Sequence, residues 1–229
     1  MVIGQIVENG IAELGMSIEI AEDSPFSPEV FFARAVTRLD REPRRAEREP
    51  LGDHHLNPDI TADGMSFRDA AVLIPVVARQ PEASVLLTQR TPHLSAHAGQ
   101  IAFPGGKIDP EDQTPAAAAL REAREEIGLQ PEAVEPVGYL TPYLTRTGYR
   151  IVPVLGRVNP EHRIVINPEE VADTFEVPLA FLMTSGNHRR GSRPFKGKTR
   201  YFYEMPFEER YIWGITAGII RGLYERVYG

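Results

Sequence analysis

The stretch "GGKIDPEDQTPAAAALREAREEIGLQ", residues 105–130, decides the fold because it joins a glycine loop to one well-delimited helix. Thr114 followed by Pro115 is a typical helix start, and Gly128 is a typical stop. We therefore predict a helix over residues 115–127. Its expected buried stripe consists of Ala116, Leu120, Ala123 and Ile127.

Three glutamates crowd one flank of this predicted helix. At 100 degrees per residue, Glu122, Glu125 and Glu126 fall within an arc of about 100 degrees, away from the expected stripe. Like charges at this spacing destabilise a helix by about 0.2–0.5 kcal/mol per pair. Arg121 can pair with Glu125 but cannot neutralise all three. The cluster is either a solvated acidic face or a site for a hard cation such as Mg2+ or Mn2+.

The segment "FPGGK", residues 103–107, favours the cation site. Gly105 and Gly106 can adopt backbone conformations that expose main-chain groups and let a phosphate or a metal approach closely. A carboxylate cluster beside a bare loop predicts metal-assisted phosphate chemistry.

Residues 106–129 resemble the Nudix box, whose pattern is G-x5-E-x7-R-E-U-x-E-E-x-G-U with U aliphatic. The matching residues of the second half are Arg121, Glu122, Ala123, Glu125, Glu126, Gly128 and Leu129. The first half departs from the pattern. Asp112 stands at the upstream glutamate position, with eight residues rather than seven between it and Arg121, and Glu111 is the alternative.

A lengthened box of this form is similar to that of one Nudix subfamily, the coenzyme A diphosphatases. The segment "LLTQRTPHLSAHAGQIAFPGG", residues 86–106, also resembles the upstream signature of that subfamily. The residues in matching places are Thr88, Arg90, Gly99, Phe103, Pro104, Gly105 and Gly106. The closing "YIWGITAGII", residues 211–220, resembles the end of the subfamily, so the likeness covers roughly residues 68–223.

The resemblance implies an α/β Nudix fold, a mixed sheet between helices, and hydrolysis of coenzyme A or acyl-CoA to 3',5'-ADP and (acyl-)4'-phosphopantetheine. It implies Mg2+ or Mn2+ held by Glu122, Glu125, Glu126 and the Gly106 carbonyl, with Glu125 or Glu126 as catalytic residues. The residues expected to bind substrate are Arg90, Gly99, Phe103, Gly105 and Lys107. Those with a structural role in the box are Arg121, Asp112 and Gly128.

Two alternative functions are considered. One is a Nudix hydrolase for ADP-ribose, dinucleoside polyphosphates or nucleoside triphosphates, and the other is a Nudix-like sensor that binds a nucleotide without cleaving it. Intact box glutamates favour an enzyme over a sensor. Acids downstream, at Glu169, Glu170 and Glu176, are either ordinary surface acids or alternative general bases. His93 and His97 have the spacing of a zinc pair but lack the glutamate of H-E-x-x-H, which favours a loop.

Composition limits the class of protein. The chain has 229 residues, 42% of them hydrophobic, which suits one domain with an extension. We assign residues 1–66 to an N-terminal extension and a charged connection, and residues 67–229 to the Nudix domain. The extension is expected to be partly helical, with Ser27 as the N-cap of its helix. The formal net charge of -7 argues against a sequence-independent nucleic-acid binder. A small-molecule substrate is expected, and the chain could form a homodimer.

No cysteine is present, which excludes disulfides and thiolate chemistry and fits a cytoplasmic location. The first residues have neither the basic nor the apolar region of a secretory signal. No apolar run reaches the ~20 residues that span a bilayer, so we expect no membrane contact.

The remaining pattern alternates strands with helices, which is typical of an α/β fold. Apolar runs predict strands in residues 70–80, 84–90, 150–158 and 199–205, and a final helix over about 207–228. Gly214, Gly218 and Gly222 repeat every four residues on that helix, which predicts a close approach by another backbone or a bulky ring.

The segment "HRRGSRPFKGKTR", residues 188–200, carries six Lys and Arg side chains and no acid in an acidic chain. We predict a loop there. Its charge is compatible with a contact to the 3'-phosphate of coenzyme A, with a solvated mobile hairpin loop, or with an RNA contact.

Overall fold

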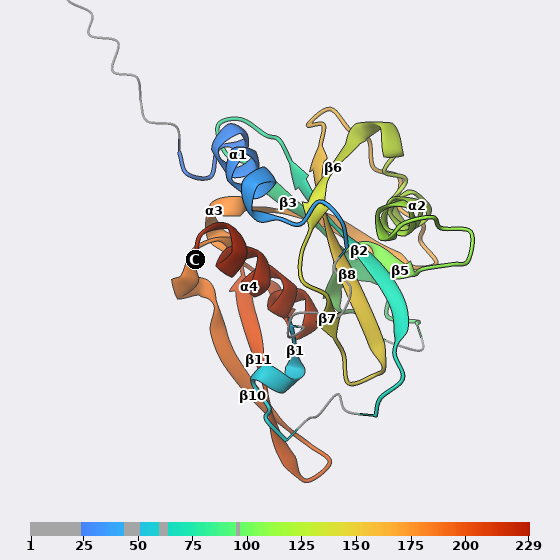
Figure 1. Ribbon diagram of the computed structural model, residues 1–229, viewed down its shortest axis with the longest axis vertical. Helices are drawn as coiled ribbons and strands as arrows, with labels where there is room; N and C mark the ends of the chain where they lie inside the picture. Colours follow the sequence, from blue (N-terminus) through green and yellow to red (C-terminus); the bar gives the residue numbers. More distant parts are fainter. Residues whose placement is uncertain (1–23, 44–50, 60–63, 95–96) are drawn as a thin grey trace, which may run out of the picture.

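The structure, a computed structural model, describes residues 24–43, 51–59, 64–94 and 97–229 (Figure 1). Much of the predicted extension and connection therefore lies outside the described residues. The helices are α1 (Pro28–Arg38), η1 (Asp53–His55), α2 (Pro115–Ile127), η2 (Pro131–Ala133), α3 (Leu179–Leu182), η3 (Ser185–Asn187) and α4 (Ile215–Val227). The strands are β1 (Leu51–Gly52), β2 (Arg68–Val77), β3 (Ser84–Arg90), β4 (Ile101–Ala102), β5 (Gly105–Lys107), β6 (Val134–Tyr139), β7 (Tyr143–Leu144), β8 (Tyr149–Val158), β9 (Val171–Pro178), β10 (Arg189–Phe195), β11 (Lys198–Phe207) and β12 (Arg210–Trp213).

Within the described residues, a nine-stranded mixed sheet forms the centre of the fold. Its main path runs β1-β7-β8-β2-β3-β4, with β5 on β2, β6 on β8 and β9 on β3. The long central strands β2 and β8 are parallel, whereas β3 pairs antiparallel with both β2 and β9. The predicted strands at residues 70–80 and 84–90 are thereby confirmed as a pair. The α/β fold class is also confirmed.

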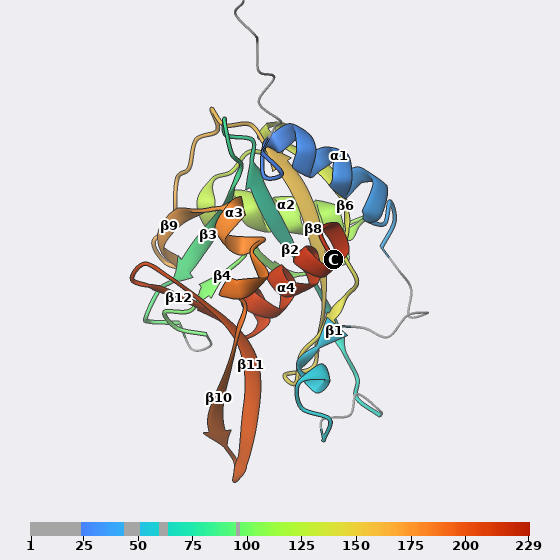
Figure 2. The same cartoon turned by 90° about the vertical axis from the view of Figure 1, so that its left-hand side faces the viewer.

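Helices cover both faces of this sheet (Figures 1 and 2). On one face, Ala119 and Ala123 of α2 pack against Leu73 of β2. On the other face, α1 and α4 share a core with Ile74 and Leu155. Strand β2 is thus buried on both sides, which explains its nearly continuous apolar sequence.

Helix α2 begins and ends as predicted, but its buried side differs from the prediction. Thr114 accepts a hydrogen bond from the Ala117 N–H at 3.1 Å, and Gly128 takes the left-handed conformation (φ 65°). The side chains buried on α2 are Ala118, Ala119, Ala123, Glu126 and Ile127, whereas Ala116 and Leu120 are only partly buried. The helix therefore turns a glutamate toward the sheet, which its sequence periodicity did not indicate.

The predicted final helix over about 207–228 was wrong at its start. Residues Arg210–Trp213 form β12, in which Ile212 pairs with Met205 of β11, and α4 begins only after Gly214 (φ 66°). Ile212 continues the apolar stripe of the helix and is also buried as part of a strand. The apolar periodicity alone therefore could not distinguish a strand from a helix at this position.

The predicted close approach to the glycines of α4 is confirmed at Gly218. A Cβ atom there would lie 2.7 Å from the ring of Tyr143. Gly214 precedes the helix and has open space around it.

The predicted loop in the basic segment was also wrong, because Arg189–Phe195 form strand β10. This strand pairs antiparallel with β11 along its whole length, from Arg189↔Glu204 to Phe195↔Lys198. Lys196 and Gly197 close the hairpin with positive φ angles of 49° and 76°, which is the signature of a two-residue type I′ turn. With β12 the hairpin makes a second, three-stranded sheet, and its two long strands extend away from the rest of the protein (Figures 1 and 2).

The described part of the N-terminal region packs on the larger fold. Ser27 caps α1 by accepting a hydrogen bond from the Val30 N–H, and Phe31 is fully buried in the core shared with α4. Leu51 and Gly52, which fall in the predicted connection, pair with β7 at the edge of the sheet. The proposed division of the chain between residues 66 and 67 stays a prediction. Among the described residues, no helix has both the length and the apolar character needed to cross a bilayer.

Candidate active site

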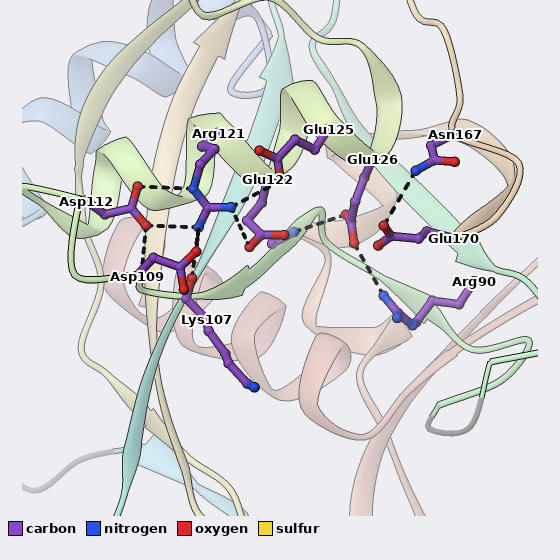
Figure 3. Close-up of polar contacts among 11 residues, drawn as sticks. Arg90, Lys107, Asp109, Asp112, Arg121, Glu122, Glu125, Glu126, Asn167 and Glu170 are labelled. Atoms are coloured by element: carbon purple, nitrogen blue, oxygen red, sulfur yellow. Dashed lines mark hydrogen bonds and ion pairs between the residues drawn. The ribbon is translucent and has the colours of Figure 1, made fainter.

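Helix α2, the glycine strand β5 and the end of β3 place the predicted site residues around one carboxylate, that of Glu126 (Figure 3). Only 3% of Glu126 is exposed. Its Oε2 accepts a hydrogen bond from the Gly105 N–H at 3.2 Å, and its Oε1 lies 3.4 Å from Nη1 of Arg90. Residues that are 21 and 36 positions away in the sequence therefore meet at this carboxylate.

Arg90 reaches this position because β3 ends beside a β-bulge. Pairing between β3 and β9 runs regularly to Gln89↔Asp173 and then shifts to Arg90↔Val171. Such bulges redirect side chains and are common next to active sites. Thr91 follows and binds the backbone of Glu170, which fixes the two segments against each other.

Arg121 organises the other carboxylates of the cluster (Figure 3). Its Nη1 donates to Glu122 at 3.0 Å and to Glu125 at 3.2 Å, and its Nη2 donates to Asp112 at 2.9 Å. The same Nη2 donates to the Lys107 carbonyl at 3.1 Å. Of the two acids considered for the upstream position, Asp112 contacts Arg121, and the Glu111 side chain is exposed.

The glycine loop leaves no room for side chains beside the cluster. A Cβ atom on Gly106 would lie 2.4 Å from the Glu122 carboxylate. On Gly105 it would lie 2.4 Å from the Ala71 carbonyl oxygen. The main chain of β5, a short strand where a loop was predicted, is therefore in direct contact with the carboxylates of Glu122 and Glu126.

Burial and mutual repulsion perturb these acids. Burial is the main cause that raises the pKa of Glu126 to about 7, with smaller contributions from the charges of Glu122 and Glu170 and opposing effects of the Gly105 hydrogen bond and Arg90. Burial also raises the pKa of Glu122, with Glu125 and Glu170 adding to the effect. The negative charge of the cluster is thus incompletely compensated by the arginines.

Glu170 belongs to this cluster, although its sequence left it indistinguishable from a surface acid. It stands just before β9 and accepts a hydrogen bond from Asn167 Nδ2 at 3.5 Å (Figure 3). The Asn167 N–H in turn donates to the Glu126 carbonyl at 2.8 Å, which ties the loop to the end of α2. Glu176 lies elsewhere, paired with Arg79 at 2.6 Å. No strand was predicted at the position of β9, so the sequence offered no signal that separated Glu170 from a surface acid.

The donor set fits a hard divalent cation. The side chains of Glu122, Glu125 and Glu126 and the carbonyl of Gly106 would supply oxygen ligands. A cation there would favour the charged forms of Glu122 and Glu126, whose pKa values are raised chiefly by burial. In the described part of the chain, no three acidic or histidine side chains are already gathered at one metal-binding point. His97 is exposed and lies 2.8 Å from Gln100, so it has no zinc partner among these residues.

A cavity of about 400 Å³ adjoins the cluster, and Arg90 and Gly105 line it. Phe103, predicted to bind substrate, also lines this cavity, although it is largely buried in the core. Gly99 is exposed and is not among the lining residues. The Lys107 side chain is exposed, and its ammonium points away from the carboxylates (Figure 3).

These features fit a hydrolase that acts on phosphoric anhydrides, and the comparisons with known proteins identify that class and its family. Residues 67–195, more than half of the chain, match the NUDIX domain family. The chain therefore belongs to the Nudix hydrolase family, whose members generally require divalent metal ions.

The similar proteins carry the same family name. The chain is 44% identical over 168 residues to a protein of Escherichia coli (strain K12 / DH10B) named uncharacterized Nudix hydrolase NudL, covering 73% of this chain and 87% of that protein. The similarity to NudL of Shigella boydii serotype 4 has the same identity and coverage. Among solved structures, RenU, a Nudix hydrolase from M. smegmatis, is 25% identical, covers 51% of this chain and 80% of its own, and has a TM-score of 0.42.

Replacing Gly105 by alanine is expected to destabilise the protein by roughly 2 to 4 kcal/mol. The added Cβ would overlap the backbone of Ala71 and Val72, and the φ of Gly105, +156°, disfavours an L side chain. Chemical denaturation monitored by circular dichroism measures the effect. Gly186→Ala is the matched control because a Cβ atom there meets open space. Equal midpoints for the two variants would contradict the assigned contact.

Proposed function

We propose that the protein hydrolyses the diphosphate bond of coenzyme A or acyl-CoA and releases 3',5'-ADP and (acyl-)4'-phosphopantetheine. A cytoplasmic location, Mg2+ or Mn2+ as the metal, and assembly into a homodimer belong to the same proposal. One observation carries it: Arg90 and Gly105, from the upstream signature, both bind Glu126 of the Nudix box and both line the adjoining cavity. The two motifs that resemble the coenzyme A subfamily thus form one site.

The carboxylate cluster and the cavity would bind different parts of the substrate. The diphosphate would lie over Glu122, Glu125 and Glu126, where a bound divalent cation would neutralise the charge of the phosphoryl oxygens. The Arg90 guanidinium faces the same point and can bind a phosphate oxygen by a charge-assisted hydrogen bond. The remainder of the substrate would occupy the cavity.

Hydrolysis requires a water molecule to lose a proton as it attacks phosphorus. The new bond joins the water oxygen to phosphorus, and the bridging P–O bond breaks with its electron pair leaving on the second phosphate. The candidate proton acceptors are Glu125 and Glu126, with Glu170, an alternative already considered from the sequence, close enough for its charge to act on Glu126. The residues expected to have a structural role, Arg121, Asp112 and Gly128, hold the cluster in position and do not line the cavity.

Incubation of the purified protein with coenzyme A, ADP-ribose, a diadenosine polyphosphate and dGTP tests the proposal. With Mg2+ or Mn2+, liquid chromatography and mass spectrometry should find 3',5'-ADP and phosphopantetheine from coenzyme A, and EDTA should abolish the products. Cleavage of another substrate with coenzyme A left intact would contradict the substrate and retain the reaction class. Failure to cleave any of the four would favour the sensor.

A further inference from the structure

The cavity beside the carboxylate cluster is lined by cations well beyond Arg90. Its lining includes four arginines, Arg90, Arg146, Arg193 and Arg200, and contains no aspartate or glutamate among the described residues. The chain as a whole has a formal net charge of -7. Local charge therefore opposes the global balance at this cavity, which indicates an anionic ligand.

Two of these arginines have a buried nitrogen without a partner. Within the described residues, the only buried side-chain nitrogen or oxygen atoms that lack a hydrogen bond are the Nε atoms of Arg90 and Arg200. Both residues line the same cavity. Buried polar groups are normally satisfied, so two unpaired donors on residues that line one cavity favour a ligand that brings acceptor oxygens to these guanidiniums.

The two donors belong to different parts of the fold. Arg90 ends β3 beside Glu126, whereas Arg200 lies on β11 of the projecting hairpin. The Nη1 of Arg200 is held by Asp59 at 2.6 Å, and Lys198 binds the same carboxylate at 2.7 Å. Only 17% of the Arg200 side chain is exposed. The Arg90 guanidinium is thus fixed beside the carboxylate cluster, and the Arg200 guanidinium is fixed on the hairpin by Asp59.

Aromatic rings hold two further arginines in the cavity. The guanidinium carbon of Arg193 lies 4.4 Å from the ring centroid of Trp213, and that of Arg146 lies 4.4 Å from that of Phe195. No ion pair joins either arginine to an acid in the described part of the chain. Arg193 and Arg200 are direct cross-strand partners in the hairpin, so their side chains share one face of it.

We propose that Arg200, with Arg193 and Arg146, binds a second phosphate group of the substrate, a phosphomonoester separate from the diphosphate at the carboxylates. This inference rests on the proposed function, because coenzyme A carries such a group on its ribose. The preferred substrate class is accordingly a nucleoside diphosphate derivative with an additional phosphate on the sugar. The hairpin therefore confers substrate specificity.

Binding of 3',5'-ADP and 5'-AMP tests this directly, because the two differ only in the second phosphate. Trp213, the single tryptophan of the chain, lines the cavity and provides a fluorescence signal for titrations in EDTA. We expect 3',5'-ADP to bind about tenfold or more tightly than 5'-AMP, as a charge-assisted contact implies. Inorganic phosphate should compete weakly, since it lacks the nucleoside.

Arg200→Gln and Arg193→Gln should each reduce this preference to less than about threefold. Arg190→Gln is the matched control, because Arg190 lies on the same strand, is exposed and does not line the cavity. Asp59→Asn removes the partner of Arg200 but keeps its guanidinium, and it should preserve the preference. If Asp59→Asn and Arg200→Gln abolished the preference equally, the hairpin position and not the guanidinium would be responsible, which would overturn the inference.

Turnover separates this inference from the proposed function. Arg200→Gln should raise the KM for coenzyme A about tenfold or more and leave dephospho-coenzyme A unaffected. Equal use of both substrates by the unmodified protein would overturn the second phosphate site and retain the diphosphatase. Preference for 3',5'-ADP that depends on Arg200, without any cleavage of coenzyme A, would support the site and contradict the proposed activity.

Discussion

Replacement of Glu126 by glutamine is expected to lower turnover by roughly 10²- to 10⁴-fold. The substitution keeps the size of the side chain and an acceptor for the Gly105 N–H, but it removes the charge that faces Arg90. Either role proposed for this residue, metal ligand or proton acceptor, requires that charge. Steady-state kinetics with saturating Mg2+ would measure the loss, and Glu132→Gln, an exposed acid outside the cluster, is the control.

The same variant should be more stable than the unmodified protein at alkaline pH when metal is absent. Burial raises the pKa of Glu126 from its ordinary value of 4.5 to about 7, so the folded protein binds a proton more tightly than the unfolded chain between these pH values. The free energy of unfolding contributed by this group therefore falls as pH rises from 4.5 to 7. At about 1.4 kcal/mol for each tenfold in proton affinity, the effect amounts to roughly 3 kcal/mol.

Denaturation in EDTA at pH 4 and pH 8 would measure this difference. Glu126→Gln should exceed the unmodified protein in stability at pH 8 and match it at pH 4. A variant that lost both activity and stability at pH 8 would show that the carboxylate is a structural partner, and it would refute the assignment of uncompensated charge to the site.

Arg121→Gln is expected to destabilise the protein by roughly 2 to 3 kcal/mol. The guanidinium binds Asp112, Glu122 and Glu125 together, and its loss would leave Asp112, whose side chain is 7% exposed, without its cation. The hydrogen bond to Asp112 and the ion pair with Glu122 both raise the pKa of Arg121, in keeping with a guanidinium held by acids. Metal affinity should fall by about 10- to 100-fold, because Arg121 orients the expected ligands.

A double-mutant cycle isolates the interaction between Arg121 and Asp112. Asp112→Asn added to Arg121→Gln removes the unpaired charge and should restore part of the stability that the single variant loses. Arg124→Gln, an exposed arginine on the same helix, controls for helix propensity and net charge. Strictly additive losses in the cycle would contradict a direct contact between Arg121 and Asp112.

Features set by local chemistry could be predicted from the sequence. The cap at Thr114 and the left-handed residue at Gly128 bound a helix of the predicted length, because both act on the nearest backbone groups. The close approach at Gly218 followed from the absence of a side chain. One error arose at β12, where the same apolar pattern fits a strand and a helix. The other arose in the basic segment, where a two-residue turn at Lys196 and Gly197 lets the residues before it pair as strand β10.

By itself, the sequence determined the chemistry of this protein: the glutamates of one helix, the glycine loop before them, and the family that this spacing defines. Only the tertiary structure decided which of these glutamates is buried and what it meets. Glu126 binds Gly105 and Arg90 because strand pairing and the rotation of α2 bring distant residues together. Glu170 and Arg200 reach their places in the same way, through contacts between segments far apart in the chain, and no local pattern encodes such contacts.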